Sequence, residues 1–349
     1  MTHAAMPSVR LSVLGAGSWG TALAALACPQ ADVLLWARDP DIAQAVRQSR
    51  QNPRYLPGIP LPDTLRATAD WTEALDHMAW GPAQAIRLIV LGVPMAGLAD
   101  LCQRLSDSLP ATLPGPVHLV WTCKGISPDT RQWPHQIVDS ALAQRPWLHT
   151  GVLSGPSFAR EVAQGLPVAL SLASAWADTG AAAQAAFHGR QARIYTTRDT
   201  IGVEVGGALK NVMAIACGIS DGLQLGTNAR AALITRGLAE IQRLGVALGG
   251  HAETFMGLTG LGDLVLTATG DLSRNRQVGL ALGQGQRLEA ILAGGMTAEG
   301  VRCAQAAWAL GRQHGLDLPI TQAVCQVLFD GISPRHAVAS LLARDARPE

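Results

Sequence analysis

A single charged side chain, Lys210, lies within a long apolar stretch of this 349-residue sequence. Between Glu204 and Asp221, the stretch GVEVGGALKNVMAIACGISDG holds no other charged residue. Such a lysine can reach out to solvent, pair with a buried acid, or transfer protons, because burial lowers a lysine pKa towards neutrality. Asn211 adjoins it, and Asp263, an isolated acid in GLGDL, is a candidate partner that would hold the lysine in position.

A glycine-rich motif near the N-terminus predicts a dinucleotide-binding turn. VLGAGSWGTALA spaces Gly15, Gly17 and Gly20 as G-x-G-x-x-G between a strand-like run and a helical pattern, the context that gives this motif its meaning. Gly15 permits the tight turn, Gly17 lets the backbone approach a pyrophosphate, and Gly20 lets the helix pack closely on the strand. The N–H groups of Ser18 and Trp19 then face the anion. A strand–helix turn without a ligand is the alternative.

The residues after the second strand-like run bear on the choice of nucleotide. An NAD site usually places an acid about 20 residues past the glycine motif, where it holds the ribose 2′-hydroxyl. WARDP places Arg38 there, and an arginine accommodates a 2′-phosphate, so NADP(H) is favoured. Asp39 follows directly and keeps NAD(H) possible. Arg38 as a solvated surface charge is the alternative.

Two strand ends in succession carry polar groups where an open α/β sheet binds its ligands. Lys124 follows the apolar run VHLVWT, with only Cys123 between them. After the next run, SGPSFARE offers Gly155 for a turn and Ser157 as a hydroxyl near a helix N-terminus. Each is also compatible with an ordinary strand–helix corner, but two in succession at one sheet edge favour a binding site.

A second polar cluster lies at 260–277, in GLGDLVLTATGDLSRNRQ. Asp271 and Ser273 are candidate N-caps for a helix that starts near Arg274. Backbone N–H groups, the guanidinium of Arg274 and the amide of Asn275 would then face one anion, and arginine suits bidentate phosphate recognition. A capped helix with solvated arginines is the alternative.

Together these features suggest hydride transfer to a carbonyl carbon of a small phosphate substrate. A nearby acid must then protonate the developing alkoxide, and a lysine ammonium both stabilises that charge and donates the proton. Lys210 is the candidate for this role. Gly206 and Gly207 beside it are expected to leave room for substrate or cofactor.

The elements that position these residues fall into two parts. Up to about residue 200, apolar strand-like runs alternate with helical patterns, which predicts βαβ units and a parallel sheet covered on both faces. Beyond it, only helical spacing follows. We therefore predict an α/β chain, with a dinucleotide-binding domain of Rossmann type at 1–200 and an α-helical substrate and catalytic domain at 201–349. The predicted strands are 9–15, 32–37, 86–94, 117–122, 150–155, 168–174 and 192–197.

Composition argues against several classes of protein. Hydrophobic residues make up 48% and charged residues 15%, which permits a sizeable core, and a net charge of +1 argues against a nucleic-acid partner. The six cysteines and nine histidines show no metal-ligand spacing, so no metal site and a reducing compartment are expected. The N-terminus is unlike a signal peptide, and no apolar run reaches about 18 residues. We expect a soluble, cytoplasmic protein without a membrane span, which forms a homodimer.

Eight segments together resemble the bacterial NAD(P)-dependent glycerol-3-phosphate dehydrogenases, in that family's order, from about residue 10 to 344. They are GAGSWGTALA, NPRYLPGI, KGI, LSGPSFAREVAQGLP, GVEVGGALKNVMAIACGISDG, NARAALITRGLAEIQRLG, TFMGLTGLGDLVLTATGDLSRNR and AEGV. The resemblance implies reversible reduction of dihydroxyacetone phosphate to sn-glycerol 3-phosphate, which supplies glycerophospholipid synthesis.

The resemblance also implies roles for individual residues. Lys210 matches the proton donor and acceptor. Further cofactor positions match Ser18, Trp19, Arg38, Tyr55, Lys124, Ala159, Arg274 and Glu299. Substrate positions match Lys124, Gly155, Ser157, Lys210, Asp263, Ser273, Arg274 and Asn275. Thr297 stands where the family usually has valine, and Met95 lies in a segment that departs from the family's pattern, but neither removes a group that the chemistry needs.

Overall fold

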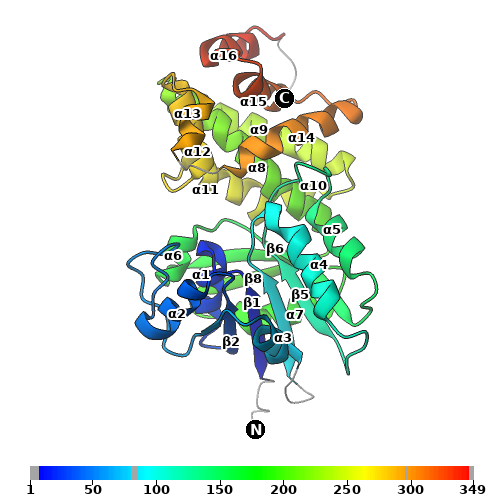
Figure 1. Ribbon diagram of the computed structural model, residues 1–349. Helices are drawn as coiled ribbons and strands as arrows, with labels where there is room; N and C mark the ends of the chain where they lie inside the picture. Colours follow the sequence, from blue (N-terminus) through cyan, green and yellow to red (C-terminus); the bar gives the residue numbers. More distant parts are fainter. Residues whose placement is uncertain (1–7, 80–84, 295–297, 346–349) are drawn as a thin grey trace. The chain divides into compact units, whose positions relative to one another are not determined.

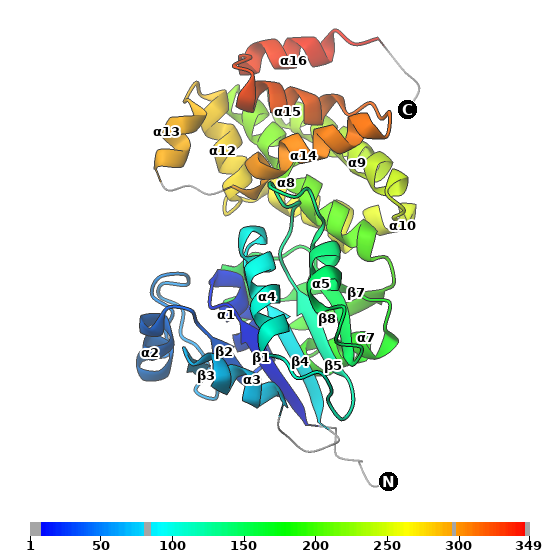
Figure 2. The same cartoon turned by 45° about the vertical axis from the view of Figure 1, so that its right-hand side comes forward.

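The protein is described by a computed structural model that covers residues 8–79, 85–294 and 298–345 (Figures 1 and 2). Its contacts divide the chain into two compact units. The first comprises Met1–Cys123 and Pro134–Thr200, and the second comprises Lys124–Trp133 and Ile201–Glu349. The sequence predicts a single boundary near residue 200, whereas Lys124–Trp133 belongs to the second unit. Ile126 and Trp133 are buried in the apolar core of that unit, which explains the assignment.

The first unit is built on one eight-stranded sheet with the order β3-β2-β1-β4-β5-β6-β7-β8. β6 and β7 pair antiparallel, and the other neighbouring pairs are parallel. The antiparallel pair arises because the chain after β6 enters α6, which packs against α1, and then turns at Gly165 (φ +79°) into β7. The strands are β1 (Val9–Leu14), β2 (Ala31–Trp36), β3 (Arg66–Thr68), β4 (Ile86–Leu91), β5 (Val117–Trp121), β6 (Leu148–Ser154), β7 (Val168–Ala173) and β8 (Ala192–Thr197).

Helices cover both faces of the central strands, as the apolar runs predict. In β4 and β5, consecutive residues are buried, although their side chains alternate between the two faces. Leu11 and Leu35 are 0% exposed, and burying one such side chain contributes about 1.5–3 kcal/mol. The helices of this unit are α1 (Ser18–Ala27), α2 (Pro40–Ser49), α3 (Trp71–Ala79), the short η1 (Met95–Gly97), α4 (Leu98–Ser108), α5 (Pro134–Leu142), α6 (Ala159–Ala163) and α7 (Ala177–Phe187).

Helices are the regular elements of the second unit within its described residues, as predicted. Its central helix, α8 (Thr200–Gly222), is buried without a break from Gly202 to Ser220. Around it lie α9 (Thr227–Ala247), α10 (Ala252–Phe255), the π-helix η2 (Leu258–Gly262), α11 (Asp263–Thr269), α12 (Arg274–Gly283), α13 (Leu288–Ala293), α14 (Glu299–Gln313), α15 (Pro319–Phe329) and α16 (Pro334–Leu342).

Close packing between α8 and α12 depends on glycine. A Cβ at Gly218 would lie 2.1 Å from the carbonyl oxygen of Arg276, and a Cβ at Gly279 would lie 2.1 Å from that of Ile215. The two backbones are therefore in direct contact, which fixes the start of α12 relative to α8.

By length and composition alone, α8 is long and apolar enough to cross a membrane, which the sequence analysis does not anticipate. However, 89% of its apolar window is buried inside the protein. Its hydrophobicity is that of a core helix.

Candidate active site

The glycine-rich turn between β1 and α1 has the geometry of an anion cradle. Gly15 adopts φ +122°, and a Cβ there would lie 2.6 Å from the carbonyl oxygen of Gly92. A Cβ at Gly20 would lie 2.0 Å from the Gly15 oxygen, so helix and strand need glycine at both positions. At Gly17 the nearest atom would be 4.0 Å away, and this residue caps α1 without a side-chain hydrogen bond. The turn therefore offers space and helix N–H groups, including those of Ser18 and Trp19, to a pyrophosphate.

Asn52 ties the loop that carries Tyr55 to this turn. Its side-chain amide donates to the Ala16 carbonyl and to Thr21 Oγ1, both at 2.9 Å, and its Oδ1 accepts from the Tyr55 N–H at 3.1 Å. Ser18 Oγ donates to the Tyr55 carbonyl at 2.8 Å. Asn52 is 0% exposed, and the sequence analysis missed it as a positioning residue.

Arg38 and Asp39 differ in how far their side chains are engaged. Arg38 is exposed just beyond the end of β2. The carboxylate of Asp39 caps α2 by accepting from the Asp41 N–H at 3.0 Å, and it pairs with Arg54 at 3.4 Å. Of these two side chains, Arg38 is therefore the one that is free to approach a ribose substituent at this end of the sheet.

Gly155, Ser157 and Ala159 follow β6 at the same edge of the sheet as the glycine-rich turn, because β6 runs parallel to β5, β4 and β1. Gly155 adopts φ +135°, and Ser157 Oγ donates to its carbonyl at 3.2 Å. Ala159 begins α6 and packs, like Trp19, against the apolar core of the sheet. The structure therefore places the predicted cofactor residues of the first unit along one edge.

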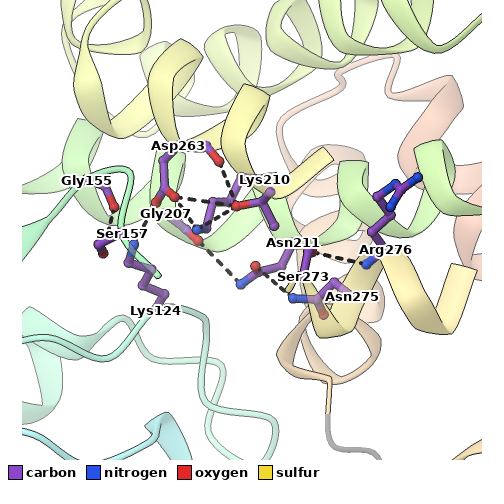
Figure 3. Close-up of polar contacts among 11 residues, drawn as sticks. Lys124, Gly155, Ser157, Gly207, Lys210, Asn211, Asp263, Ser273, Asn275 and Arg276 are labelled. Carbon is purple, nitrogen blue, oxygen red and sulfur yellow. Dashed lines mark hydrogen bonds and ion pairs between the residues drawn. The ribbon is translucent and has the colours of Figure 1, made fainter. Parts of the chain in front are cut away.

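In the second unit, Lys210 and Lys124 both bind the carboxylate of Asp263 (Figure 3). Lys210 Nζ donates to Oδ1, and Lys124 Nζ donates to Oδ2 at 2.6 Å. Thr267 Oγ1 accepts a second hydrogen bond from Lys210 Nζ at 3.0 Å and donates to the Asp263 carbonyl at 2.7 Å. Asp263 is 0% exposed and Lys210 is 6% exposed, so the expected pairing of these two residues is present in a closed environment.

The π-helix η2 positions Asp263 beside the two lysines. η2 ends at Gly262, immediately before Asp263, and single π turns are frequent at functional sites. A Cβ at Gly206 would lie 2.6 Å from the carbonyl oxygen of Thr259, in η2. The expectation that Gly206 leaves room for a ligand is therefore wrong, because the space beside it is filled by the chain that carries Asp263.

The buried environment of Lys210 lowers the pKa of its ammonium group. Desolvation lowers its pKa to about 8, although Asp263 acts to raise the pKa, and the nearby charge of Lys124 lowers it further. At neutral pH the ammonium form therefore predominates, yet its proton is given up more readily than that of an exposed lysine. This is the behaviour required of a group that both donates and accepts a proton.

Lys124 and Lys210 are the only lysines in the sequence. The remainder of the 27 lysine and arginine residues are arginines. An arginine is effectively always protonated in proteins, whereas a lysine exchanges its proton when buried. This count is a signal in the sequence that singles out Lys124 together with Lys210.

Amide side chains connect α8 to the start of two further helices. Asn275 Nδ2 donates to Asn211 Oδ1 at 2.9 Å, and the Gly300 N–H donates to Asn275 Oδ1 at 2.9 Å. Ser273 is the N-cap of α12, as its Oγ accepts from the Arg276 N–H at 3.2 Å. The amide of Asn275 is thereby fixed beside the residue that follows Lys210.

Asp271 does not cap α12, in contrast to Ser273. Its carboxylate instead accepts from Arg276 Nη1 at 2.9 Å. Arg276 also donates through Nε to Asp221 at 2.9 Å, and Asp221 accepts from Arg230 at 3.0 Å. These pairs brace the start of α12, where Arg274 is exposed.

Glu299, the first residue of α14, belongs to the same electrostatic environment. Burial raises the pKa of its carboxyl, while the charges of Arg274, Lys124 and Lys210 act to lower the pKa.

Two residues depart from the family pattern. Met95 is buried in η1, and Thr297 lies outside the described residues.

Comparison with protein families gives two matches that together span most of the chain. Residues 10–179 match the model described as NAD-dependent glycerol-3-phosphate dehydrogenase N-terminus. Residues 199–339 match the model described as NAD-dependent glycerol-3-phosphate dehydrogenase C-terminus.

Individual relatives agree with these matches. The chain is 58% identical over 342 residues to glycerol-3-phosphate dehydrogenase [NAD(P)+] of Burkholderia cenocepacia (strain HI2424), covering 98% of this chain and 100% of the relative, and the values are the same for the Burkholderia orbicola (strain MC0-3) protein. A crystal structure of glycerol-3-phosphate dehydrogenase from Coxiella burnetii superposes with a TM-score of 0.86 at 39% identity, over 97% of this chain and 99% of that one.

Proposed function

Since the chain belongs to the family of NAD-dependent glycerol-3-phosphate dehydrogenases, we propose that its Lys210 is the proton donor and acceptor of the reaction. The protein is an NAD(P)-dependent oxidoreductase, which interconverts dihydroxyacetone phosphate and glycerol 3-phosphate. The observation that carries the proposal is the buried ion pair of Lys210 with Asp263, in which burial lowers the pKa of the lysine to about 8.

The proposed chemistry divides hydride and proton between two partners. The nicotinamide, when bound, supplies the hydride that converts the C2 carbonyl into an alkoxide. The Lys210 ammonium stabilises the negative charge as it develops on the C2 oxygen and transfers a proton to it, which leaves the alcohol and a neutral amine. In the oxidative direction, the neutral amine removes the hydroxyl proton.

Asp263 and Thr267 position this ammonium group. Together they engage Lys210 Nζ in two hydrogen bonds, which leaves its third donor for the substrate oxygen. Lys124 occupies the other oxygen of Asp263, so the carboxylate cannot rotate away without losing a second ion pair. We propose that Lys124 adds a second positive charge towards substrate and cofactor.

The start of α12 is the proposed phosphate site. Ser273 caps the helix, Arg274 is exposed, and the Asn275 amide is held by Asn211, so a guanidinium, helix N–H groups and an amide come together at one helix end. Asp263 completes the proposed substrate set of the second unit. Gly155 and Ser157 are proposed as substrate contacts from the first unit.

The first unit fits the nucleotide. The open space at Gly17 and the glycine requirements at Gly15 and Gly20 match a bound pyrophosphate, with Ser18, Trp19, Tyr55 and Ala159 along the same edge. We propose that Arg38 holds the 2′-phosphate of NADP(H), since Asp39 already caps α2. Lys124, Arg274 and Glu299 are proposed as the cofactor contacts of the second unit.

We further propose that the enzyme acts in the cytoplasm as a homodimer and that its product supplies glycerophospholipid synthesis. The substrate is a small phosphorylated molecule, in keeping with the polar start of α12.

Replacement of Lys210 by alanine tests the proposal. NADPH oxidation in the presence of dihydroxyacetone phosphate should fall by about 10²–10⁴-fold, because the proton donor is lost. The Kd for NADPH, measured by fluorescence titration, should remain nearly unchanged. Turnover close to that of the wild type would rule out the assigned role. As a matched control, Arg236→Ala on α9 removes an exposed cation and should leave turnover unchanged.

A further inference from the structure

Three potential metal ligands from distant parts of the sequence come together in the first unit. His118 is the second residue of β5, and His149 is the second residue of β6. The two are direct register partners in the parallel pair of strands. Asp178 lies in the first turn of α7. One ring nitrogen from each histidine and one carboxylate oxygen of Asp178 all lie within 4.8 Å of one another.

Neighbouring side chains hold both imidazole rings. His149 stacks on Trp176, with ring centroids 4.0 Å apart and an interplanar angle of 5°, and its Nδ1 lies 2.8 Å from Asp178 Oδ2. His118 Nδ1 lies 3.1 Å from Thr179 Oγ1. Metal-binding histidines are commonly fixed in this way by surrounding groups. The contacts with Trp176 and Thr179 therefore order the two rings without a bound ion.

The three residues differ in exposure, and the more exposed ones leave a path by which an ion can enter from solvent. His118 is buried, so it would hold an ion from the inner side of the cluster. The side chain of Asp178 is 48% exposed and that of His149 is 16% exposed.

We propose that His118, His149 and Asp178 bind a divalent transition-metal ion, with zinc as the expected occupant. Two imidazoles and one carboxylate form a donor set found in zinc sites that keep a further position for water. The ligand atoms, which lie within 4.8 Å of one another, must rearrange to meet the Zn–N and Zn–O bond lengths of about 2.0–2.2 Å. Asp178, as the most exposed of the three, is the side chain that moves.

The proposed ion would have a structural effect. It would connect β5 and β6 to the start of α7, three elements whose sequence positions are far apart. His118 and His149 lie at the amino ends of their strands, and the glycine-rich turn follows the carboxyl end of the parallel strand β1. The ion would thus lie at the opposite end of the sheet and would stabilise the first unit without entering the dehydrogenase reaction.

Zinc binding can be measured directly on the full chain without an affinity tag. After treatment with a chelator, the protein is titrated with ZnCl₂ in a calorimeter, and its Tm is recorded with and without zinc. We expect one high-affinity site per chain and a Tm that rises with zinc. With CoCl₂, the visible spectrum should show the d–d bands of a site with nitrogen and oxygen ligands.

Variants assign the site to these residues. His149→Gln should abolish high-affinity binding. Asp178→Asn should weaken it by at least about 10-fold, because changing even the outer partners of metal ligands typically costs about 10–100-fold. His336→Gln, which removes an exposed histidine of α16, should bind zinc like the wild type. Because His118 is buried and its replacement can impair folding, the variants at the more exposed His149 and Asp178 decide the question. Absence of zinc uptake by the wild type, or equal uptake in wild type and His149→Gln, would overturn the proposal.

Discussion

Lys210 and Asp263 form an ion pair that is almost closed to solvent, with side-chain exposures of 8% and 0%. The second oxygen of Asp263 binds Lys124, so both lysines of the chain meet on one carboxylate. Two ammonium groups and one carboxylate leave a net positive charge inside the second unit. An anionic substrate that develops further negative charge during reduction is stabilised by such an arrangement.

The presence of only two lysines makes the charge state of Lys210 directly measurable. In protein labelled with ¹⁵N at the lysine side chains, NMR should give two side-chain signals, which Lys124→Arg assigns. We expect the Lys210 signal to titrate with a pKa of about 8, because burial disfavours its charged form. A value near the ordinary lysine pKa of about 10.4 would contradict this interpretation of the site.

Asp263→Asn should damage both stability and activity. The change leaves two ammonium groups facing each other without a counter-charge, and loss of one partner from a buried ion pair typically costs about 3–5 kcal/mol. Urea unfolding should show this loss, and kcat should fall because Lys210 is no longer held. Thr267→Val removes one hydrogen bond to Lys210 and should cost about 1 kcal/mol. Equal stability of Asp263→Asn and wild type would show that the pair is not formed in solution.

Replacement of Arg38 by alanine should change nucleotide preference. Arg38 is exposed at the end of β2, whereas Asp39 is engaged in capping α2, so a 2′-phosphate has Arg38 as its partner. The KM for NADPH should rise about 10-fold or more, the loss expected for a charge-assisted contact worth about 1.5–3 kcal/mol. The KM for NADH should change little. A proportional rise in both would mean that Arg38 acts on the nucleotide without reading its 2′-substituent. Arg236→Ala, which removes an exposed cation of α9, provides the control.

Glu240 should make the stability of the second unit depend on pH. It is 1% exposed and accepts hydrogen bonds from the N–H groups of Ile320 and Thr321 at the start of α15. Desolvation raises its pKa above the unfolded value of 4.5, so the native state binds the proton more readily than the unfolded state. The Glu240 contribution therefore grows as pH falls from neutrality towards 4.5 and shrinks as pH rises.

Urea unfolding of the wild type and Glu240→Gln at several pH values measures this effect. The stability difference should move in favour of the wild type on acidification. Glu240→Ala should lose about 1–3 kcal/mol at all these pH values, because two buried N–H groups lose their acceptor. A difference between wild type and Glu240→Gln that does not vary with pH would contradict the raised pKa.

Local signals in the sequence account for the features that were predicted correctly. The turn at Gly15, Gly17 and Gly20 is encoded within a few neighbouring residues, and the structure shows the close contacts that demand glycine. The fold class follows from alternating patterns of the same local kind. The strand β3 was missed because three residues carry too little pattern. The antiparallel pairing of β6 and β7 was missed because the apolar composition of a strand does not encode its direction in the sheet.

Contacts between distant residues account for what was missed. Asp263 was expected to hold Lys210, but nothing near Lys124 indicates that it binds the same carboxylate or belongs to the second unit. Thr267 and Asn52 are common polar residues whose importance appears only when their partners are placed beside them. The two lysines among many arginines are a signal that does lie in the sequence, since their count needs no structure.

The pH dependence of kcat in both directions tests the role of Lys210 most directly. Reduction of dihydroxyacetone phosphate requires the ammonium form, so kcat should fall as pH rises above about 8, whereas oxidation of glycerol 3-phosphate requires the neutral amine and should rise through the same range. In Lys210→Arg the guanidinium stays protonated. The residual reduction should then lose its decline near pH 8, and oxidation should be nearly abolished. A Lys210→Arg enzyme with wild-type rates and an unchanged pH profile would contradict the assignment of Lys210 as the group that exchanges the proton.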